Sequence, residues 1–281
     1  MRETEPDVLF GYLDDLLEVD AWPDYSGAEN GVQVSVGAGK RVCRVGAAVD
    51  ASERIICRAL DLDLDLLMVH HGLFWDTARP VTGRRYRKLE PLLREGIGLY
   101  SAHLPLDAHP VLGNCAVLAR ALGLETDRRF GSWKERDIGF SAPVASMDPF
   151  RASAPGWTPP EELPPAAPLR SGDRAAWCRW VETVTGHPVH LIPGGPEEVR
   201  RVGIVTGGGA SFIEEAAREG VDTLITGEGA HHTWLDSHEL EVNVLYAGHY
   251  ATETWGVRAL AEELSDRFGL SWTFLDDPSG L

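Results

Sequence analysis

Hydrophobic and polar positions along this chain follow first a helical period and then a repeated order of strand, helix and strand. Apolar residues at helical spacing near the start predict an opening amphipathic helix: Val8, Leu9, Tyr12, Leu13, Leu16 and Leu17. An apolar run over 42–49, a helical pattern over 51–60 and a second apolar run over 64–69 predict a βαβ unit. Such a unit implies a parallel sheet with a right-handed crossover.

The alternation of helices and strands continues beyond this unit. The further expected elements are a helix around 86–93, a strand over 97–102, a helix over 116–122, a strand over 137–142, a helix over 175–184 and a strand over 189–192. Prolines between 143 and 168 interrupt any periodic pattern, which favours a linker or a surface excursion. We therefore expect an α/β protein with a first lobe over 1–140, a Pro-rich linker over 141–170 and a second lobe over 171–281. N-terminal segments can pack across the two lobes.

An internal repeat relates the two expected lobes. A shift of 157 positions aligns Arg44-Val45-Gly46 with Arg201-Val202-Gly203 and Asp65 with Asp222, without a gap. A shift of 146 positions aligns Leu99-Tyr100 with Leu245-Tyr246, His103 with His249 and Asp107 with Glu253. Similarity between two ordinary βα units can produce the apolar matches, but it accounts less well for the shared His-x-x-x-carboxylate pattern. We therefore expect two related α/β halves whose strand ends face a shared cleft.

Composition and charge are those of a soluble globular protein. Among 281 residues, 43% are hydrophobic and 25% charged. The net charge of −17 argues against a nucleic-acid surface, which needs clustered Lys and Arg. The four cysteines are widely spaced, which favours free thiols in a reducing compartment. The acidic N-terminus resembles neither a signal nor a transit peptide, and no apolar run reaches membrane-spanning length. We expect a cytoplasmic protein without a membrane or nucleic-acid polymer partner.

Paired histidines follow the strand expected over 64–69. His70 and His71 stand where α/β sheets bind ligands, beyond the carboxyl end of a strand. Neighbouring strand residues face opposite sides, so both rings can reach one site only if the backbone turns, and Gly72 permits a turn. The alternative is two unrelated loop histidines. His103 and Asp107 follow the next strand in the same way.

His249 and Glu253 are four residues apart, the spacing that places two side chains on one helix face. A surface pair is the alternative, and Thr252 as N-cap would leave His249 outside the helix. Together the four histidines and two carboxylates are sufficient ligands for two metals with a bridging carboxylate.

Other candidate residues are more weakly supported. Gly207-Gly208-Gly209 can present backbone N–H groups to a phosphate, but the absence of a P-loop lysine favours a tight turn. Asn30 is interpreted as a turn residue. Glu228, His231 and His232 follow an expected strand end, so we expect them near the cleft, facing substrate or supporting the ligands.

The sequence resembles the Nif-three-like family, also called the YbgI-type dinuclear metal-centre proteins and catalogued as GTP cyclohydrolase 1 type 2 homologues. The matching motifs span nearly the whole chain in order: 30–34, Val69-His70-His71-Gly72, 100–107, Thr206-Gly207-Gly208-Gly209, Thr226-Gly227-Glu228 and 248–253. The resemblance implies a two-lobed fold, a toroidal homohexamer built as a trimer of dimers, and a dinuclear metal site in the interlobe cleft.

The same resemblance implies the metal ligands. At the matching positions these are His70, His71, Asp107, His249 and Glu253, with His103 as an additional ligand or a close supporting group. The expected cofactors are two divalent ions per chain, of Zn, Fe, Mn, Ni or Co.

Two functions remain open from the sequence. The first is a metal-dependent hydrolase of a small-molecule nucleotide or phosphoester, in which His103 or Glu228 moves protons. The family label suggests hydrolytic opening of the guanine ring of GTP. The second is a non-catalytic metal-binding ring that acts as a scaffold or regulator. An open coordination position and a substrate-sized pocket favour the enzyme, whereas a closed site favours the scaffold.

Overall fold

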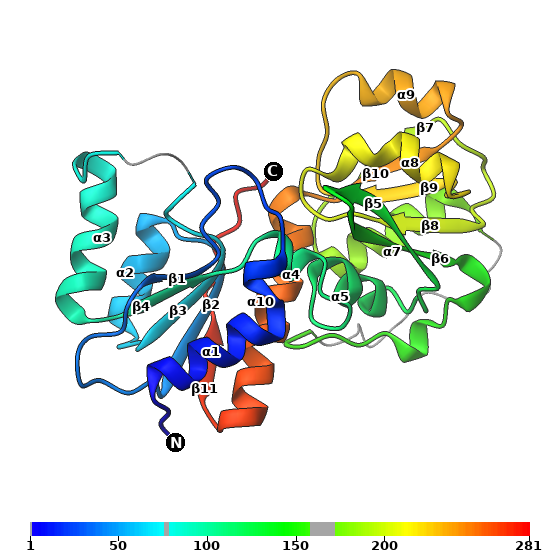
Figure 1. The fold of residues 1–281 in the computed structure, drawn as a ribbon. Helices are drawn as coiled ribbons and strands as arrows, with labels where there is room; N and C mark the ends of the chain where they lie inside the picture. The colour runs from blue at the N-terminus through cyan, green and yellow to red at the C-terminus, as the bar shows by residue number, and fades with distance from the viewer. Residues whose placement is uncertain (1, 76–78, 158–171) are drawn as a thin grey trace. The chain divides into compact units, whose positions relative to one another are not determined.

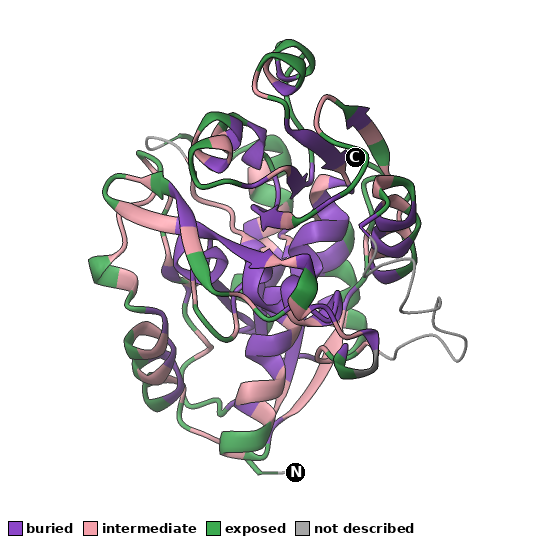
Figure 2. Ribbon diagram, turned by 90° about the vertical axis from the view of Figure 1, so that its right-hand side faces the viewer, coloured by how far each residue is buried: buried purple, intermediate pink, exposed green. Residues whose placement is uncertain are grey.

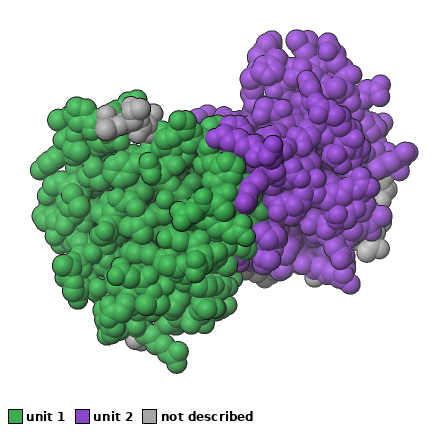
Figure 3. All heavy atoms as spheres, in the orientation of Figure 1, with its two compact units in different colours: residues 1–109, 256–277 green, residues 110–255, 278–281 purple. Residues whose placement is uncertain are grey.

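The chain folds into two compact α/β units in a computed structural model that describes residues 2–75, 79–157 and 172–281. Unit 1 comprises residues 1–109 and 256–277, and unit 2 comprises residues 110–255 and 278–281 (Figure 3). Each unit has its own sheet. Much of the expected Pro-rich linker, from residue 158 onwards, lies outside the described residues.

The sheet of unit 1 has five strands in the order β1-β4-β3-β2-β11 (Figure 1). Their bounds are Gly31–Val34 for β1, Gly98–Ser101 for β4, Leu66–His71 for β3, Arg44–Asp50 for β2 and Ser271–Phe274 for β11. All neighbouring pairs are parallel except β1 with β4. The carboxyl ends of β2, β3 and β4 therefore lie at one edge of this sheet.

Helices cover both faces of the unit 1 sheet. They are α1 (Pro6–Leu17), η1 (Val19–Ala21), α2 (Glu53–Asp61), α3 (Gly83–Glu95), α4 (Leu104–Asp107) and the later part of α10 (His249–Phe268). Leu99 packs in the cluster formed with α2 and α3, whereas the ring of Tyr100 stacks on Phe10 of α1. Alternate residues of β4 thus face opposite helical layers, as the strand period requires.

Local signals place the helices of unit 1. The Ser52 hydroxyl caps α2 by accepting from the Ile55 N–H, and Ile55, Ile56 and Ala59 form the buried face of that helix. Gly96, at φ +65°, ends α3 in the left-handed conformation that glycine adopts without strain. Buried residues concentrate in the strands and on the covering faces of the helices (Figure 2).

The sheet of unit 2 has six strands in the order β5-β6-β8-β9-β10-β7. Their bounds are Arg128–Trp133 for β5, Arg136–Pro143 for β6, Arg201–Ile204 for β8, Thr223–Thr226 for β9, Asn243–Tyr246 for β10 and His190–Pro193 for β7. The central strands β8, β9 and β10 are parallel, and the other pairs are antiparallel. The helices are α5 (Asn114–Ala121), η2 (Val144–Ser146), η3 (Pro149–Arg151), α7 (Arg174–Thr185), η4 (Gly209–Phe212), α8 (Ile213–Arg218), α9 (Thr233–Glu239) and the start of α10.

Strand pairing confirms the two related halves. Val45 pairs with Leu66 in unit 1, and Val202 pairs with Thr223 in unit 2, each 157 positions further on. The edge strands repeat too, because β1 and β7 lie antiparallel to β4 and β10. The alignment by 146 positions is wrong within the strands β4 and β10 themselves. Ser101 and Tyr246 occupy equivalent pairings, which is a shift of 145, because one more residue separates β10 from His249 than separates β4 from His103.

The aspartates that the repeat matches have the same structural role. Asp65 Oδ2 accepts from the backbone N–H groups of Cys43 and Arg44, both at 2.8 Å. Asp222 Oδ2 accepts from those of Arg200 and Arg201 at 2.8 and 3.2 Å. Each carboxylate therefore fixes the start of the neighbouring parallel strand.

Replacing either aspartate with alanine is expected to lower the free energy of unfolding by about 1–3 kcal/mol, because two backbone donors lose their acceptor. Denaturant titration of Asp65→Ala and Asp222→Ala measures this loss. Asp61→Ala, at an exposed position of α2, is the control and is expected to change little. Equal stability of all three variants would show that the aspartates do not anchor the strands.

The unit boundaries differ from those expected at residues 140 and 170. Residues 110–140 contribute α5, β5 and part of β6 to unit 2, since β6 pairs with β8. At the other end of the chain, β11 pairs with β2 and so belongs to unit 1. Within the described ranges, no helix is both long and apolar enough to cross a membrane.

Candidate metal centre

Three histidines converge at the carboxyl edge of the unit 1 sheet. His70 and His71 end β3, and His103 follows β4 directly before α4. One ring nitrogen of each lies within 4.8 Å of one ring nitrogen of each of the other two. Parallel neighbouring strands bring their carboxyl ends together, so the fold itself gathers these rings. The group could hold a metal ion.

Hydrogen bonds fix the two rings of β3. The Nδ1 of His70 lies 2.8 Å from the carbonyl oxygen of Ala102, and the Nδ1 of His71 lies 2.9 Å from Asp50 Oδ1. Because a carbonyl oxygen only accepts, Nδ1 of His70 carries the proton and its Nε2 carries the lone pair. The Asp50 carboxylate favours the same tautomer for His71. Metal-binding histidines are oriented in this way by a carbonyl or carboxylate.

His103 is held by a small polar network that begins in the first loop. Its Nδ1 lies 2.9 Å from Asp24 Oδ1, and its backbone N–H donates to Asn30 Oδ1 at 2.8 Å. Asn30 Nδ2 donates in turn to Asp24 Oδ2 at 2.9 Å. Burial opposes ionisation of Asp24, but the hydrogen bonds from His103 and Asn30 hold its pKa below the usual value. Asn30 is thus a positioning residue rather than only a turn residue.

Asp107 is buried at the end of α4, four residues after His103. Its Oδ2 lies 3.5 Å from Nε2 of His70. A carboxylate oxygen and a ring nitrogen at this distance can both bind one metal ion. Buried carboxylates in proteins are usually paired with a cation or bound to a metal. The half-site of unit 1 therefore combines three imidazoles with one carboxylate.

Gly72 has a different role from the expected turn. Both histidines belong to β3, their ring centroids are 4.7 Å apart, and Gly72 does not adopt a positive φ. A Cβ at this position would instead overlap the side-chain amide of Gln33. Gln33 Oε1 accepts from the Leu73 N–H at 2.6 Å, so the glycine leaves room for a side chain that fixes the next loop.

His249 and Glu253 form the corresponding group in unit 2. His249 is the first residue of α10, so the alternative with Thr252 as the N-cap is wrong. His249 Nε2 lies 3.1 Å from Glu253 Oε2, and its Nδ1 lies 2.8 Å from Glu228 Oε1. The hydrogen bond to Glu253, opposed by burial and assisted by Glu228, raises the pKa of His249 to about 9. A metal that binds this ring must displace that proton.

The glycine-rich turn contacts Glu253. Gly207 has φ +62°, and a Cβ there would overlap the Glu253 carboxylate. The Gly207 N–H donates to Thr252 Oγ1 at 3.0 Å, and its carbonyl accepts from the N–H groups of Gly227 and Glu228. The motif is therefore a close-packed turn behind a buried carboxylate, in agreement with the turn interpretation. His231 and His232 are exposed at the start of α9.

The carboxylate that accepts a hydrogen bond from His71 is expected to tune metal affinity. Asp50→Ala should weaken metal binding about 10–100-fold, because the ring of His71 loses the carboxylate that orients it. Competition with a chelating dye measures the affinity, and Asp61→Ala is the matched control. Wild-type affinity in Asp50→Ala would show that this carboxylate does not orient a metal ligand.

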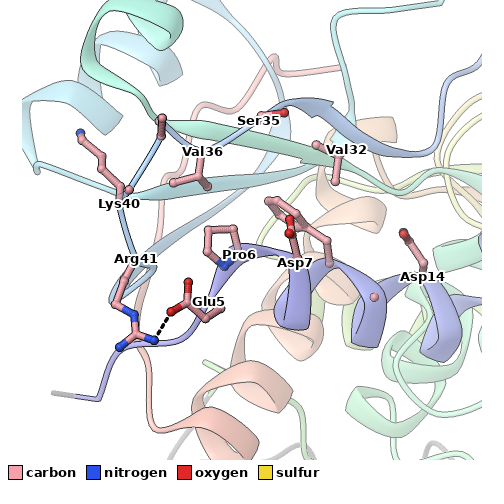
Figure 4. A pocket seen from close by; sticks show the side chains of 14 residues that line it. Glu5, Pro6, Asp7, Asp14, Val32, Ser35, Val36, Lys40 and Arg41 are labelled. Carbon is pink, nitrogen blue, oxygen red and sulfur yellow. Dashed lines mark hydrogen bonds and ion pairs between the residues drawn. The ribbon is translucent and has the colours of Figure 1, made fainter.

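A separate pocket of about 820 Å³ in unit 1 has different chemistry. It lies against α1 and the chain after β1, and its lining includes Glu5, Asp7, Asp14, Lys40 and Arg41 (Figure 4). Arg41 pairs with Glu5, and the Lys40 ammonium donates to the Glu95 carbonyl. None of the described residues that line this pocket is a histidine, so they lack the ligand set found at the strand ends.

Comparisons with known proteins identify the family. The model of the family Duf34/NIF3 (NGG1p interacting factor 3) matches residues 7–279. The chain belongs to the NIF3 family. A protein of Deinococcus radiodurans named GTP cyclohydrolase 1 type 2 homolog is 40% identical over 275 residues, which are 98% of this chain and 94% of that protein.

Two solved structures share the fold. The protein YbgI, whose function is described as unknown, matches with a TM-score of 0.81 and 34% identity, over 99% of this chain and 100% of that one. A protein of Thermus thermophilus matches with a TM-score of 0.77 and 36% identity, over the same shares. The expected family and the α/β fold are confirmed.

The side chains of this NIF3-family chain fit a divalent metal. Neutral imidazole and carboxylate are suitable ligands for zinc and for harder divalent ions, and each histidine of the two half-sites has its Nδ1 on an oxygen acceptor. Sequence reasoning missed Asp24 and Asp50, which lie outside the matching motifs. Their signal is weak, since Asp50 is only the last residue of an apolar strand and Asp24 a loop residue.

Proposed function

We propose that this NIF3-family protein binds two divalent metal ions and hydrolyses a nucleotide or another phosphoester. The proposed metal ligands are His70, His71, Asp107, His249 and Glu253. The ligands come from both units, so the proposal requires the two half-sites to form one centre. The family and the donor chemistry of each half-site support it.

The orientation of the histidines is the observation that carries this proposal. His70, His71, His103 and His249 each hold Nδ1 against a carbonyl or carboxylate oxygen at 2.8–2.9 Å. In His70, His71 and His103 the arrangement directs the lone pair to Nε2, whereas in His249 a metal must displace the Nε2 proton. An oxygen acceptor on Nδ1 matches the carboxylate–histidine–metal arrangement of known metal sites.

The chemistry then divides between the metal and the chain. When bound, a pair of divalent ions would supply Lewis acidity and lower the pKa of a water molecule. Glu228 orients His249 through its Nδ1, and Asp107 supplies negative charge beside His70. We assign proton movement to His103, because Asp24 holds its Nδ1 proton and leaves Nε2 able to accept another.

A turnover assay tests the hydrolase. Protein purified without oxygen is incubated with a panel of phosphoesters and with GTP, and the same preparation is analysed for metal. Two metals per chain with turnover that disappears in His71→Ala support the proposal. Two metals without turnover favour a non-catalytic ring scaffold, and the hydrolase is then abandoned.

We also propose that six chains assemble as a trimer of dimers, as the family resemblance implies. Light scattering on a size-exclusion column measures the molar mass directly. A mass of six chains supports the assembly, and a stable monomer contradicts it.

A further inference from the structure

A second pocket of unit 1 adjoins the three histidines. Its volume is about 400 Å³, and its lining includes Trp75, Arg79, Arg84, Arg85 and Lys88. Among the described residues that line it, none is an Asp or a Glu. In a chain of net charge −17, four cationic side chains around one cavity form a local positive site.

Two cationic side chains of this pocket differ from other cations of helix α3 in their ion pairs. Arg87 of α3 forms a two-point ion pair with Glu53 at 2.8 and 2.9 Å, and Arg94 pairs with Glu90. Arg84 and Lys88, which line the pocket, form no ion pair within the described ranges. Helix α3 thus carries two arginines in ion pairs, and it also carries Arg84 and Lys88, whose charges can contact a ligand.

Lys88 and Arg84 stand close enough to repel each other. Lys88 is half-buried, and its pKa is lowered first by that burial and then by the Arg84 charge, against the opposite effect of Glu53 and Asp50. Like charges held near one another are stabilised when an anion lies between them. Arg85 is fixed nearby, because its guanidinium lies over the Phe74 ring and donates to the Arg79 carbonyl.

The start of α3 adds to this positive site. Thr82, at the N-cap, lines the pocket and makes no side-chain cap, and the first turn of this 13-residue helix contains no acidic residue. The first N–H groups of a helix carry partial positive charge. These N–H groups therefore add positive charge to the same pocket as the cationic side chains.

Trp75 joins the pocket to the candidate metal centre. Its ring centroid lies 4.7 Å from that of His103 and 5.6 Å from that of His71. The indole Nε1–H donates to the Gly72 carbonyl at 2.9 Å, which fixes the ring beside the residue that follows His71. A ligand in the pocket therefore lies next to the imidazoles of unit 1.

We propose that this pocket binds the phosphate groups of a polyphosphate-bearing substrate, with Arg84 and Lys88 as its principal cationic contacts. The inference rests on the proposed function and narrows it: the substrate is a multiply charged polyphosphate compound, such as a nucleoside triphosphate, rather than a neutral or singly charged ester. Arginine can grip a phosphate with two N–H groups, and lysine adds a point charge.

Calorimetric titration of the metal-loaded protein with tripolyphosphate tests this pocket. The double variant Arg84→Gln/Lys88→Gln is expected to raise the Kd at least about tenfold, because two charge-assisted contacts are lost. Arg94→Gln, on the same helix but outside the pocket, is the matched control and is expected to stay within about twofold. Arg84→Glu is a second variant and should abolish binding. Thermal melting confirms that each variant is folded.

Additional ligands show whether the phosphate groups or the nucleoside provide the binding. Additional outcomes distinguish failure of the pocket from failure of the proposed function. GTP and tripolyphosphate both bind in the expected result, and guanosine alone binds much more weakly. Unchanged metal content in Arg84→Gln/Lys88→Gln with lost tripolyphosphate binding supports the pocket. Wild-type affinity in that variant, or an equal loss in Arg94→Gln, overturns it.

A wild type that binds metal and turns over a substrate but does not bind tripolyphosphate overturns the pocket alone. A wild type that binds tripolyphosphate in the pocket but no metal supports the pocket while the proposed function fails.

Discussion

Asp107→Ala is expected to weaken metal binding by more than about a hundredfold while the fold is retained. Loss of a residue that merely orients a ligand costs about 10–100-fold in affinity, and loss of a ligand itself should cost more. Asp107 is buried, with its Oδ2 3.5 Å from His70 Nε2. Elemental analysis after dialysis measures the remaining metal, and circular dichroism checks the fold.

Two further variants make the Asp107 result interpretable. Asp107→Asn keeps the shape of the side chain but replaces an anionic ligand with a neutral amide, so it should also lose metal. Asp61→Ala removes an exposed aspartate from α2 and should keep the full metal content. Unchanged metal in a folded Asp107→Ala would remove Asp107 from the ligand set.

Gly207→Ala is expected to lower both stability and metal content. A non-glycine residue at φ +62° costs about 1–2 kcal/mol, and the added Cβ would overlap the Glu253 carboxylate. Glu253 is buried and must move, which removes it from His249 Nε2 at its present 3.1 Å. Denaturant titration of the metal-free protein and metal analysis of the loaded protein measure the two effects.

The next residue supplies a matched control. Gly208 has φ −81°, and a Cβ there would meet no atom within 4 Å. Gly208→Ala should therefore change the free energy of unfolding by no more than about 0.5 kcal/mol and leave the metal content intact. If both variants behave alike, the close approach of Gly207 to Glu253 has no energetic importance.

The periodic part of the fold was predictable from the sequence. The strands β2, β3 and β4 and helix α2 have long apolar or helical patterns. The shift of 157 also holds in the structure: Val45 pairs with Leu66, and the residues 157 positions later, Val202 and Thr223, pair in the same way. The aspartates at 65 and 222 were matched by position, and their common hydrogen bonds explain why the match exists. Burial and backbone pairing leave regular signals in a sequence.

The elements that were not predicted lack such signals. Strand β11 (Ser271–Phe274) is half-buried and pairs with β2, more than two hundred positions earlier in the chain. Neither its short length nor its composition indicates that partner. The strand β5 (Arg128–Trp133) begins with two arginines and carries a positive-φ glycine, Gly131, so its apolar pattern is weak.

The supporting residues of the candidate site were the least predictable. The roles of Asp24, Asn30 and Gln33 depend on hydrogen bonds to His103 and Leu73, residues more than 30 positions away. A single polar residue in a loop has no period, and its usual interpretation as a turn residue is correct for many sites. Only the folded chain shows which loop side chains reach the histidines.

Metal content per chain tests the central claim most directly. Protein purified without oxygen and without added chelator is analysed for first-row metals, beside the folded variants Asp107→Ala and Asp61→Ala. The proposed dinuclear centre predicts two divalent ions per chain in the wild type and in Asp61→Ala, with a clear loss in Asp107→Ala. A wild-type protein that carries no metal and takes none up from solution would contradict it.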